Sequence, residues 1–125
     1  MGIGSLEAHR LHKLCSDLLR SGFVAGSSKL YEIERAAYVC LDQCSGVDRT
    51  ICFSMAAVLD HLAKSQEDRP VLPEDGVALA NALNQPLNQC ADYLVGRGAG
   101  LDPMQLVARL IDAYVRVARP NSDAN

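Results

Sequence analysis

The N-terminal part of the chain carries the clearest spacing of side chains for ligating a metal ion. His9, His12 and Cys15 recur at every third residue, so on a helix they spread over about 120° of the surface and could point their donors toward one side. A closed zinc site needs four ligands, and only the distant His61 or a further cysteine is left to supply the fourth. We therefore expect a solvated histidine-bearing helix edge and no bound metal or other cofactor. A metal-binding or redox-sensing bundle that uses these Cys and His residues is the alternative from another class of protein.

Five cysteines raise the question of disulfide or redox chemistry. The odd number and the lack of a basic-then-apolar signal pattern at the N-terminus argue against a disulfide framework. Cys52 borders the apolar stripe of its predicted helix, and the other four fall on such stripes: Cys15, Cys40, Cys44 and Cys90. Because buried free cysteine behaves as a small apolar side chain, we expect reduced core thiols that react slowly in the folded protein.

The sequence contains no residue pattern that is typical of an active site. The carboxylates are scattered along the chain, and none is paired as an acid and a base would be. Between Cys44 and Arg49 there are four residues, whereas the phosphate loop of cysteine phosphatases needs five. The glycines at 96, 98 and 100 follow no strand and precede no Lys-Ser/Thr pair, as a phosphate-binding loop requires. We expect a protein that is not an enzyme.

The composition sets limits on the partners. The chain has 125 residues, 49% of them hydrophobic and 22% charged, with a formal net charge of -3. This size fits one compact domain, and an acidic balance without blocks of Lys or Arg gives no footprint for nucleic acid. The longest unbroken apolar run, Ala36 to Leu41, is far below the roughly 20 residues that span a bilayer. We expect a cytoplasmic protein that binds neither nucleic acid nor membrane.

Apolar residues recur at helical spacing in five segments, and no stretch alternates as a strand would. In chain order the predicted helices run from Ser5 to Gly22, from Ser28 to Cys44, from about Gly46 to Lys64, from Pro73 to about Leu94 and from Pro103 to about Ala118. Residues 65–72 are polar and lack a period, which predicts a linker, and residues 1–4 and 120–125 are expected to be flexible ends. The prediction is an all-α, bundle-like single domain over residues 1–125, built from about five amphipathic helices.

The last helix has the best start signal in the chain and the widest apolar face. Asp102 is a good N-cap, and Pro103 suits the first helical position. The apolar residues of this helix cover about half of its circumference, more than a surface helix of one small bundle needs. We predict self-association through this face, as a homodimer, with four contact residues: Leu106, Leu110, Tyr114 and Val117. The alternative use of the face is a groove for a partner protein.

Three aromatic residues lie off the apolar stripes of their own helices. Tyr31 and Tyr38 share one flank of the second predicted helix, seven residues apart, and Phe53 lies nearly opposite the stripe of the third. Exposed aromatic side chains are frequent anchors of protein binding. We predict these three residues as partner contacts, although a neighbouring helix that covers them is the alternative.

In size, acidity and all-helical build, the whole chain resembles the small bacterial antiactivators that disable quorum-sensing transcription regulators. The resemblance implies a non-catalytic, stoichiometric negative regulator that blocks a working surface of its partner protein. An immunity protein that neutralises a toxin is a second expectation of the same broad kind.

Overall fold

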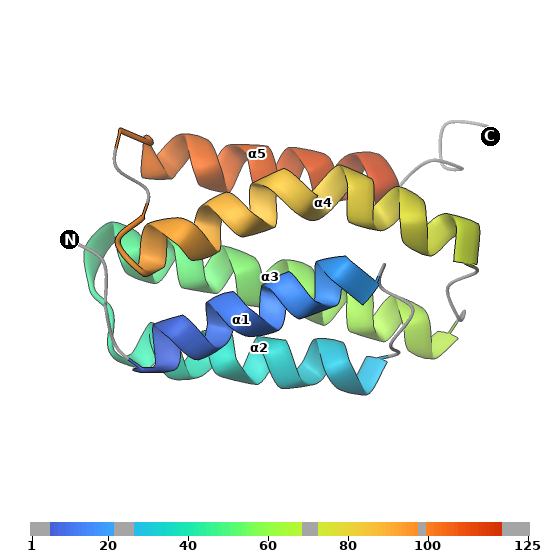
Figure 1. Cartoon of the computed structure of the whole chain (residues 1–125), viewed down its shortest axis with the longest axis horizontal. Helices are drawn as coiled ribbons and strands as arrows, with labels where there is room; N and C mark the ends of the chain where they lie inside the picture. The colour runs from blue at the N-terminus through green and yellow to red at the C-terminus, as the bar shows by residue number, and fades with distance from the viewer. Residues whose placement is uncertain (1–5, 22–26, 69–72, 98–99, 119–125) are drawn as a thin grey trace.

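The structure, a computed structural model, describes residues 6–21, 27–68, 73–97 and 100–118. Every regular element in those ranges is an α-helix, which confirms the predicted all-α fold (Figure 1). The helices are α1 (Leu6–Ser21), α2 (Ser27–Asp42), α3 (Gly46–Asp68), α4 (Pro73–Leu94) and α5 (Pro103–Ala118). Over the described ranges, none of them combines the length and the apolarity needed to cross a membrane.

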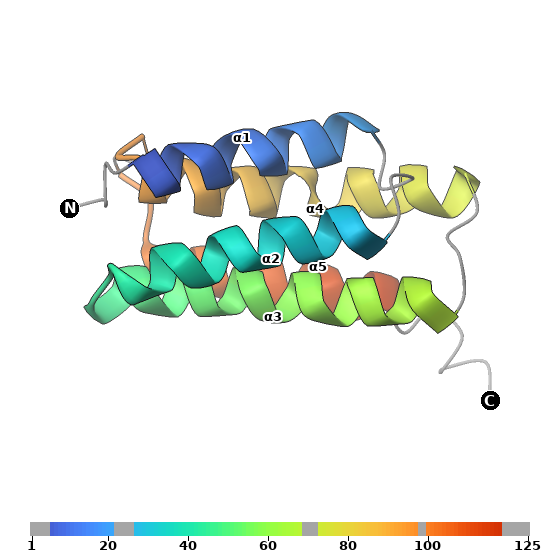
Figure 2. The ribbon, with the colours of Figure 1, turned by 90° about the horizontal axis from the view of Figure 1, so that it is seen from below.

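The helices pack as a ring in the order α1, α2, α3, α5, α4. Contact between α4 and α1 closes the ring. α1, α3 and α5 run in one direction, and α2 and α4 run in the other (Figure 1). Figure 2 shows α1 and α4 along one side of the bundle and α3 and α5 along the other, with α2 between α1 and α3. As a result, α2 and α5 lie on opposite sides of the molecule.

One apolar core lies inside this ring, and every helix contributes to it. The largest fully buried side chains are Leu11, Leu18, Leu30, Ile33, Ile51, Met55, Leu59, Leu83, Leu87, Leu94 and Leu106. Burial of each such side chain contributes about 1.5–3 kcal/mol to folding. Most of these positions follow the three- and four-residue spacing from which the helices were predicted.

The connection from α4 to α5 shows why these two helices end and begin where they do. Gly96 has a φ of 83°, and the backbone N–H groups of Gly96 and Arg97 donate to the carbonyl oxygens of Tyr93 and Asp92 at 3.1 and 2.8 Å. This is the Schellman pattern, in which a left-handed glycine ends a helix. At the start of α5, Asp102 Oδ1 accepts the N–H of Met104 at 3.1 Å, which confirms the predicted N-cap.

The predicted linker over residues 65–72 is wrong in its first half. α3 does not end at Lys64 but continues to Asp68. The four added residues are polar and have no apolar period, but none of them is a glycine or a proline, the residues that most disfavour a helix interior. The first such residue is Pro70, which disfavours helical backbone at the residue before it. Residues 69–72 and the predicted flexible ends, 1–4 and 120–125, lie outside the described residues.

Candidate functional site

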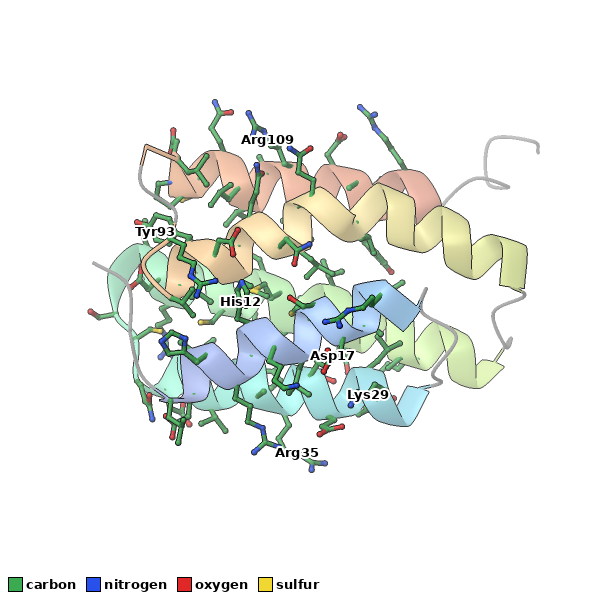
Figure 3. The ribbon with its side chains drawn as sticks, in the orientation of Figure 1. His12, Asp17, Lys29, Arg35, Tyr93 and Arg109 are labelled. Atoms are coloured by element: carbon green, nitrogen blue, oxygen red, sulfur yellow. The ribbon has the colours of Figure 1, made fainter. Side chains whose placement is uncertain are left out.

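The three residues weighed as candidate metal ligands, His9, His12 and Cys15, do not come together. His12 Nε2 lies 2.6 Å from Oδ1 of Asp92, so this side chain joins α1 to α4 (Figure 3). His9 is exposed to solvent, while Cys15 is fully buried. Among the side chains that the structure describes, no group of three or more His, Cys, Asp or Glu residues is placed to hold a metal ion. The three residues therefore face different surroundings: His9 faces solvent, His12 faces α4 and Cys15 faces the core.

Four of the five cysteines lie in the core, and for Cys15, Cys40 and Cys90 this confirms the prediction. The prediction is wrong for the other two, because Cys52 is fully buried and Cys44, which follows the end of α2, is only partly buried. Burial raises the pKa of the Cys15 and Cys90 thiols to about 12 and that of Cys40 to about 11. Burial also raises the pKa of Cys52, and the neighbouring Cys44 raises it further. Because the thiolate is the reactive form, these four thiols are protected by both burial and protonation.

Cys44 is the exception, because it follows α2 and is only partly buried. Its Sγ donates to the carbonyl oxygen of Cys40 at 2.9 Å and lies 3.7 Å from Sγ of Cys52. Burial and the charge of Asp48 raise its pKa, while a hydrogen bond with Cys52 and the charge of Arg49 offset part of this rise. Cys44 is therefore the most reactive of the five thiols.

We expect a maleimide to modify one thiol per native molecule, at Cys44, and the other four only as the protein unfolds. The reason is that Cys44 is the one thiol of the five that is not buried, so a reagent can reach it without unfolding of the protein. Mass spectrometry over a labelling time course counts the modified thiols, and Cys44→Ser serves as the control that removes the early modification. Early labelling of several thiols in the native protein would contradict the burial of the other four.

The three predicted partner-contact aromatics have three different surroundings. Tyr31 is partly buried and packs against the core, so its neighbours cover part of the ring and it offers less surface to a partner than the other two. Tyr38 on α2 is 42% exposed, and Phe53 on α3 is 58% exposed. Phe53 is thus the most exposed of the three aromatic side chains predicted as partner contacts.

The four predicted self-association residues of α5 mostly face inward. Leu106 and Leu110 are 1% and 0% exposed, so both belong to the core and neither offers a surface to a second molecule. Tyr114 is partly buried, and the side chain of Val117 lies outside the described residues. The apolar face is wide because it combines a core stripe with a second, exposed stripe.

That exposed stripe is the part of the surface that sequence reasoning missed. Met104, Ile111 and Val115 are 54%, 46% and 38% exposed. Together with the exposed Ala108 they are separated by four, three and four residues, which is the spacing of one helix face. This spacing was the signal that could have separated the exposed stripe from the buried one.

An apolar groove runs between α3 and α5, with a volume of about 320 Å³. It is lined from α3 by Phe53, Ser54, Ala57, Val58 and His61, and from α5 by Ile111, Tyr114 and Val115. Phe53, Ala57 and His61 are four residues apart, so they lie above one another on a single face of α3. Ile111 and Val115 do the same on α5. Because α3 and α5 run in the same direction, both rows follow the length of the groove.

The polar groups along this groove are few: the Ser54 hydroxyl, the His61 ring and the Tyr114 hydroxyl. The Ser54 hydroxyl donates to the carbonyl oxygen of Thr50 at 2.9 Å. The rings of His61 and Tyr114 meet edge to face, with centroids 5.9 Å apart, and burial raises the pKa of Tyr114. The groove therefore offers apolar contact rather than a set of converging polar groups.

A pair of carboxyl groups, the buried Glu34 and the partly exposed Asp60, joins α2 to α3, and no sequence pattern indicated it. Burial and the neighbouring charge of Asp60, to which Glu34 is hydrogen-bonded, raise the pKa of Glu34. Lys64 Nζ lies 2.8 Å from Oδ2 of Asp60 and lowers the pKa of Asp60. Of the two carboxyl groups, Glu34 is therefore the one that takes up a proton first as the pH falls.

We expect Glu34→Gln to raise the melting temperature at about pH 8 and to change it little below the ordinary glutamate pKa of 4.5. A carboxyl group whose pKa is higher in the folded than in the unfolded protein destabilises the folded state at high pH. This loss of stability develops as the pH rises from the pKa of the unfolded state through that of the folded state. The amide keeps a donor toward Asp60 but cannot ionise.

Calorimetry at the two pH values measures this difference, and Glu32→Gln on the exposed side of the same helix is the matched control. An equal effect of Glu34→Gln at both pH values, or a loss of stability at the higher one, would show that the pKa of Glu34 is not raised in the folded protein.

Comparisons with protein-family models, with curated proteins and with solved structures found no match to this chain.

Proposed function

We propose that this chain is a non-catalytic protein-binding module that holds an amphipathic helix of a partner protein in the groove between α3 and α5. The observation that carries the proposal is the exposure of Phe53, Ile111 and Val115 side by side along one apolar groove. Surface side chains of this size are common singly, but a continuous apolar row of them is typical of a binding surface.

The dimensions of the groove favour a helix as its occupant. Phe53 and His61 are eight residues apart, which corresponds to about 12 Å along α3. A docked helix places its anchor residues i, i+3, i+4 and i+7 over nearly the same length. The small side chains of Ser54 and Ala57 lie between these two larger ones and leave room for such anchors.

The chemistry of the lining favours a protein over a small polar ligand. Sites for small molecules combine an apolar wall with a few polar groups that fix the orientation of the ligand. Here the Ser54 hydroxyl is already bound to Thr50, and Tyr114 meets His61 through its ring. An apolar helix face requires no further polar partner from this surface.

A module that covers the apolar face of a helix also denies that face to every other protein, so we propose that binding is inhibitory and stoichiometric. The resemblance in size and build to antiactivators favours a transcription regulator as the partner. The net charge of -3 and the lack of a block of Lys or Arg in the sequence support binding to the regulator rather than to its DNA.

Photo-crosslinking in the native cell tests the proposal, with benzoylphenylalanine in place of Phe53 and, as the matched control, in place of Tyr38. We expect one discrete 1:1 adduct from position 53 and none from position 38. The crosslinked partner segment should carry apolar residues at helical spacing, and the synthetic peptide of that segment should bind the purified chain. Equal adducts from both positions, or a segment without this spacing, would contradict the proposal.

A further inference from the structure

The exposed stripe of α5 has a spacing that the groove does not explain. Met104, Ala108, Ile111 and Val115 are separated by four, three and four residues and are exposed, or half-exposed in the case of Val115. This is the d-a-d-a order of a heptad seam, in which two helices pack their side chains between each other. Only Ile111 and Val115 also line the groove, whereas Met104 and Ala108 lie beyond it.

The stripe matches itself when a second α5 is placed antiparallel to the first. With the two-fold axis between Ala108 and Ile111, each Ala108 faces Ile111 of the other copy, and each Met104 faces Val115. All four layers then pair an a position with a d position. A small residue opposite a large one near the axis allows the two helices to approach closely.

The charges beside the stripe match in the same arrangement. Arg109 and Asp112 lie on one flank of the stripe, three residues apart and on either side of the proposed axis. Antiparallel pairing therefore brings Arg109 of each copy beside Asp112 of the other. Arg109 has no ion-pair partner in the described part of its own chain, and Figure 3 shows it on α5 at the outer edge of the bundle. Asp112 contacts Arg116 of its own helix at 3.0 Å.

We propose that two copies of this chain associate through an antiparallel, two-fold contact of their α5 helices, with Met104, Ala108, Ile111 and Val115 as the seam and reciprocal Arg109–Asp112 pairs along its edge. The inference does not depend on the proposed helix-binding function. The contact residues differ from those expected from the sequence: Leu106 and Leu110 are buried, whereas a second copy can reach these four side chains. Because Ile111 and Val115 belong to both surfaces, association of two copies and binding of a partner helix exclude each other at these side chains.

Sedimentation equilibrium of the full chain tests the proposal through an exchange of charges. We expect the unmodified protein to be largely dimeric at about 100 μM. Arg109→Asp alone and Asp112→Arg alone should each weaken the dimer about tenfold or more, because the two-fold symmetry introduces every like-charge contact twice. The double variant carrying both changes should restore the dissociation constant to within about threefold of the original, because it rebuilds the pairs with the charges reversed.

Arg35→Asp on α2 is the matched control, since Figure 3 shows Arg35 on the opposite edge of the bundle from Arg109. This change alters the net charge by the same amount and should leave the dimer unaffected. Phe53→Ala, which changes the groove but not the seam, should also leave it unaffected. Circular dichroism verifies that each variant is folded. A monomer at about 1 mM, a dimer insensitive to the single changes, or a double variant as weak as the singles would overturn the proposal.

Discussion

Leu110→Ala is expected to lower the free energy of unfolding by about 2–5 kcal/mol, whereas Ile111→Ala, one residue further along, should change it by no more than about 0.5 kcal/mol. Leu110 is fully enclosed in the core, so its truncation removes buried apolar surface and leaves a cavity. Ile111 is nearly half exposed, and alanine is the better helix former of the two. Denaturant titration of both variants measures the difference, at a protein concentration low enough for the chain to be monomeric.

This pair of adjacent residues tests the orientation of α5 in the bundle. A rotation of α5 by about 100° about its axis, which is the angle between successive residues, would exchange the roles of the two side chains. Equal losses of stability, or a larger loss for Ile111→Ala, would therefore contradict the packing of α5 against the core. A Leu110→Ala variant that kept its stability and only became monomeric would instead restore the interface expected from the sequence.

The parts of the fold that depend on local rules could be predicted from the sequence. The Asp102-Pro103 pair defines the start of α5 because capping involves neighbours within three residues. The presence of five helices and the burial of Cys15 follow from spacing along single helices. The end of α3 was placed too early because polar residues do not end a helix by themselves.

The candidate site depends on the ring order of the helices, which no single helix encodes. An apolar half-circumference on α5 does not indicate which part of it faces the core, because this depends on where α3 and α4 lie. Leu106 and Ile111 therefore looked equivalent in the sequence. For the same reason, the Tyr31 and Phe53 rings both looked like surface anchors, although a neighbouring element covers part of one and leaves the other open.

Phe53→Ala should weaken binding of the crosslinked partner helix about thirtyfold or more, with little change in melting temperature. Truncation of a hot-spot residue costs about 2 kcal/mol or more of binding free energy, and this ring is the largest exposed part of the groove. Because more than half of the residue is already exposed, the folded chain alone gains little from it. Isothermal titration calorimetry and a melting curve on the same sample give both quantities.

Two further variants separate binding from stability. Tyr38→Ala removes an exposed ring on α2, outside the groove, and should leave the affinity unchanged. Met55→Ala removes a fully buried side chain of α3 and should lower the melting temperature while the affinity per folded molecule is kept. A large drop in melting temperature for Phe53→Ala, with unchanged affinity, would place that ring in the core and remove the proposed surface.

Methyl-resolved NMR during titration with the partner helix shows whether the groove between α3 and α5 is the binding surface. Ala57, Ile111 and Val115 carry methyl groups in the groove, while Leu6 on α1 and Val39 on α2 carry exposed methyl groups elsewhere. At constant protein concentration, we expect the three groove residues to shift with the added helix and the other two to stay in place. Shifts at Leu6 or Val39 with the groove residues unchanged would contradict the account.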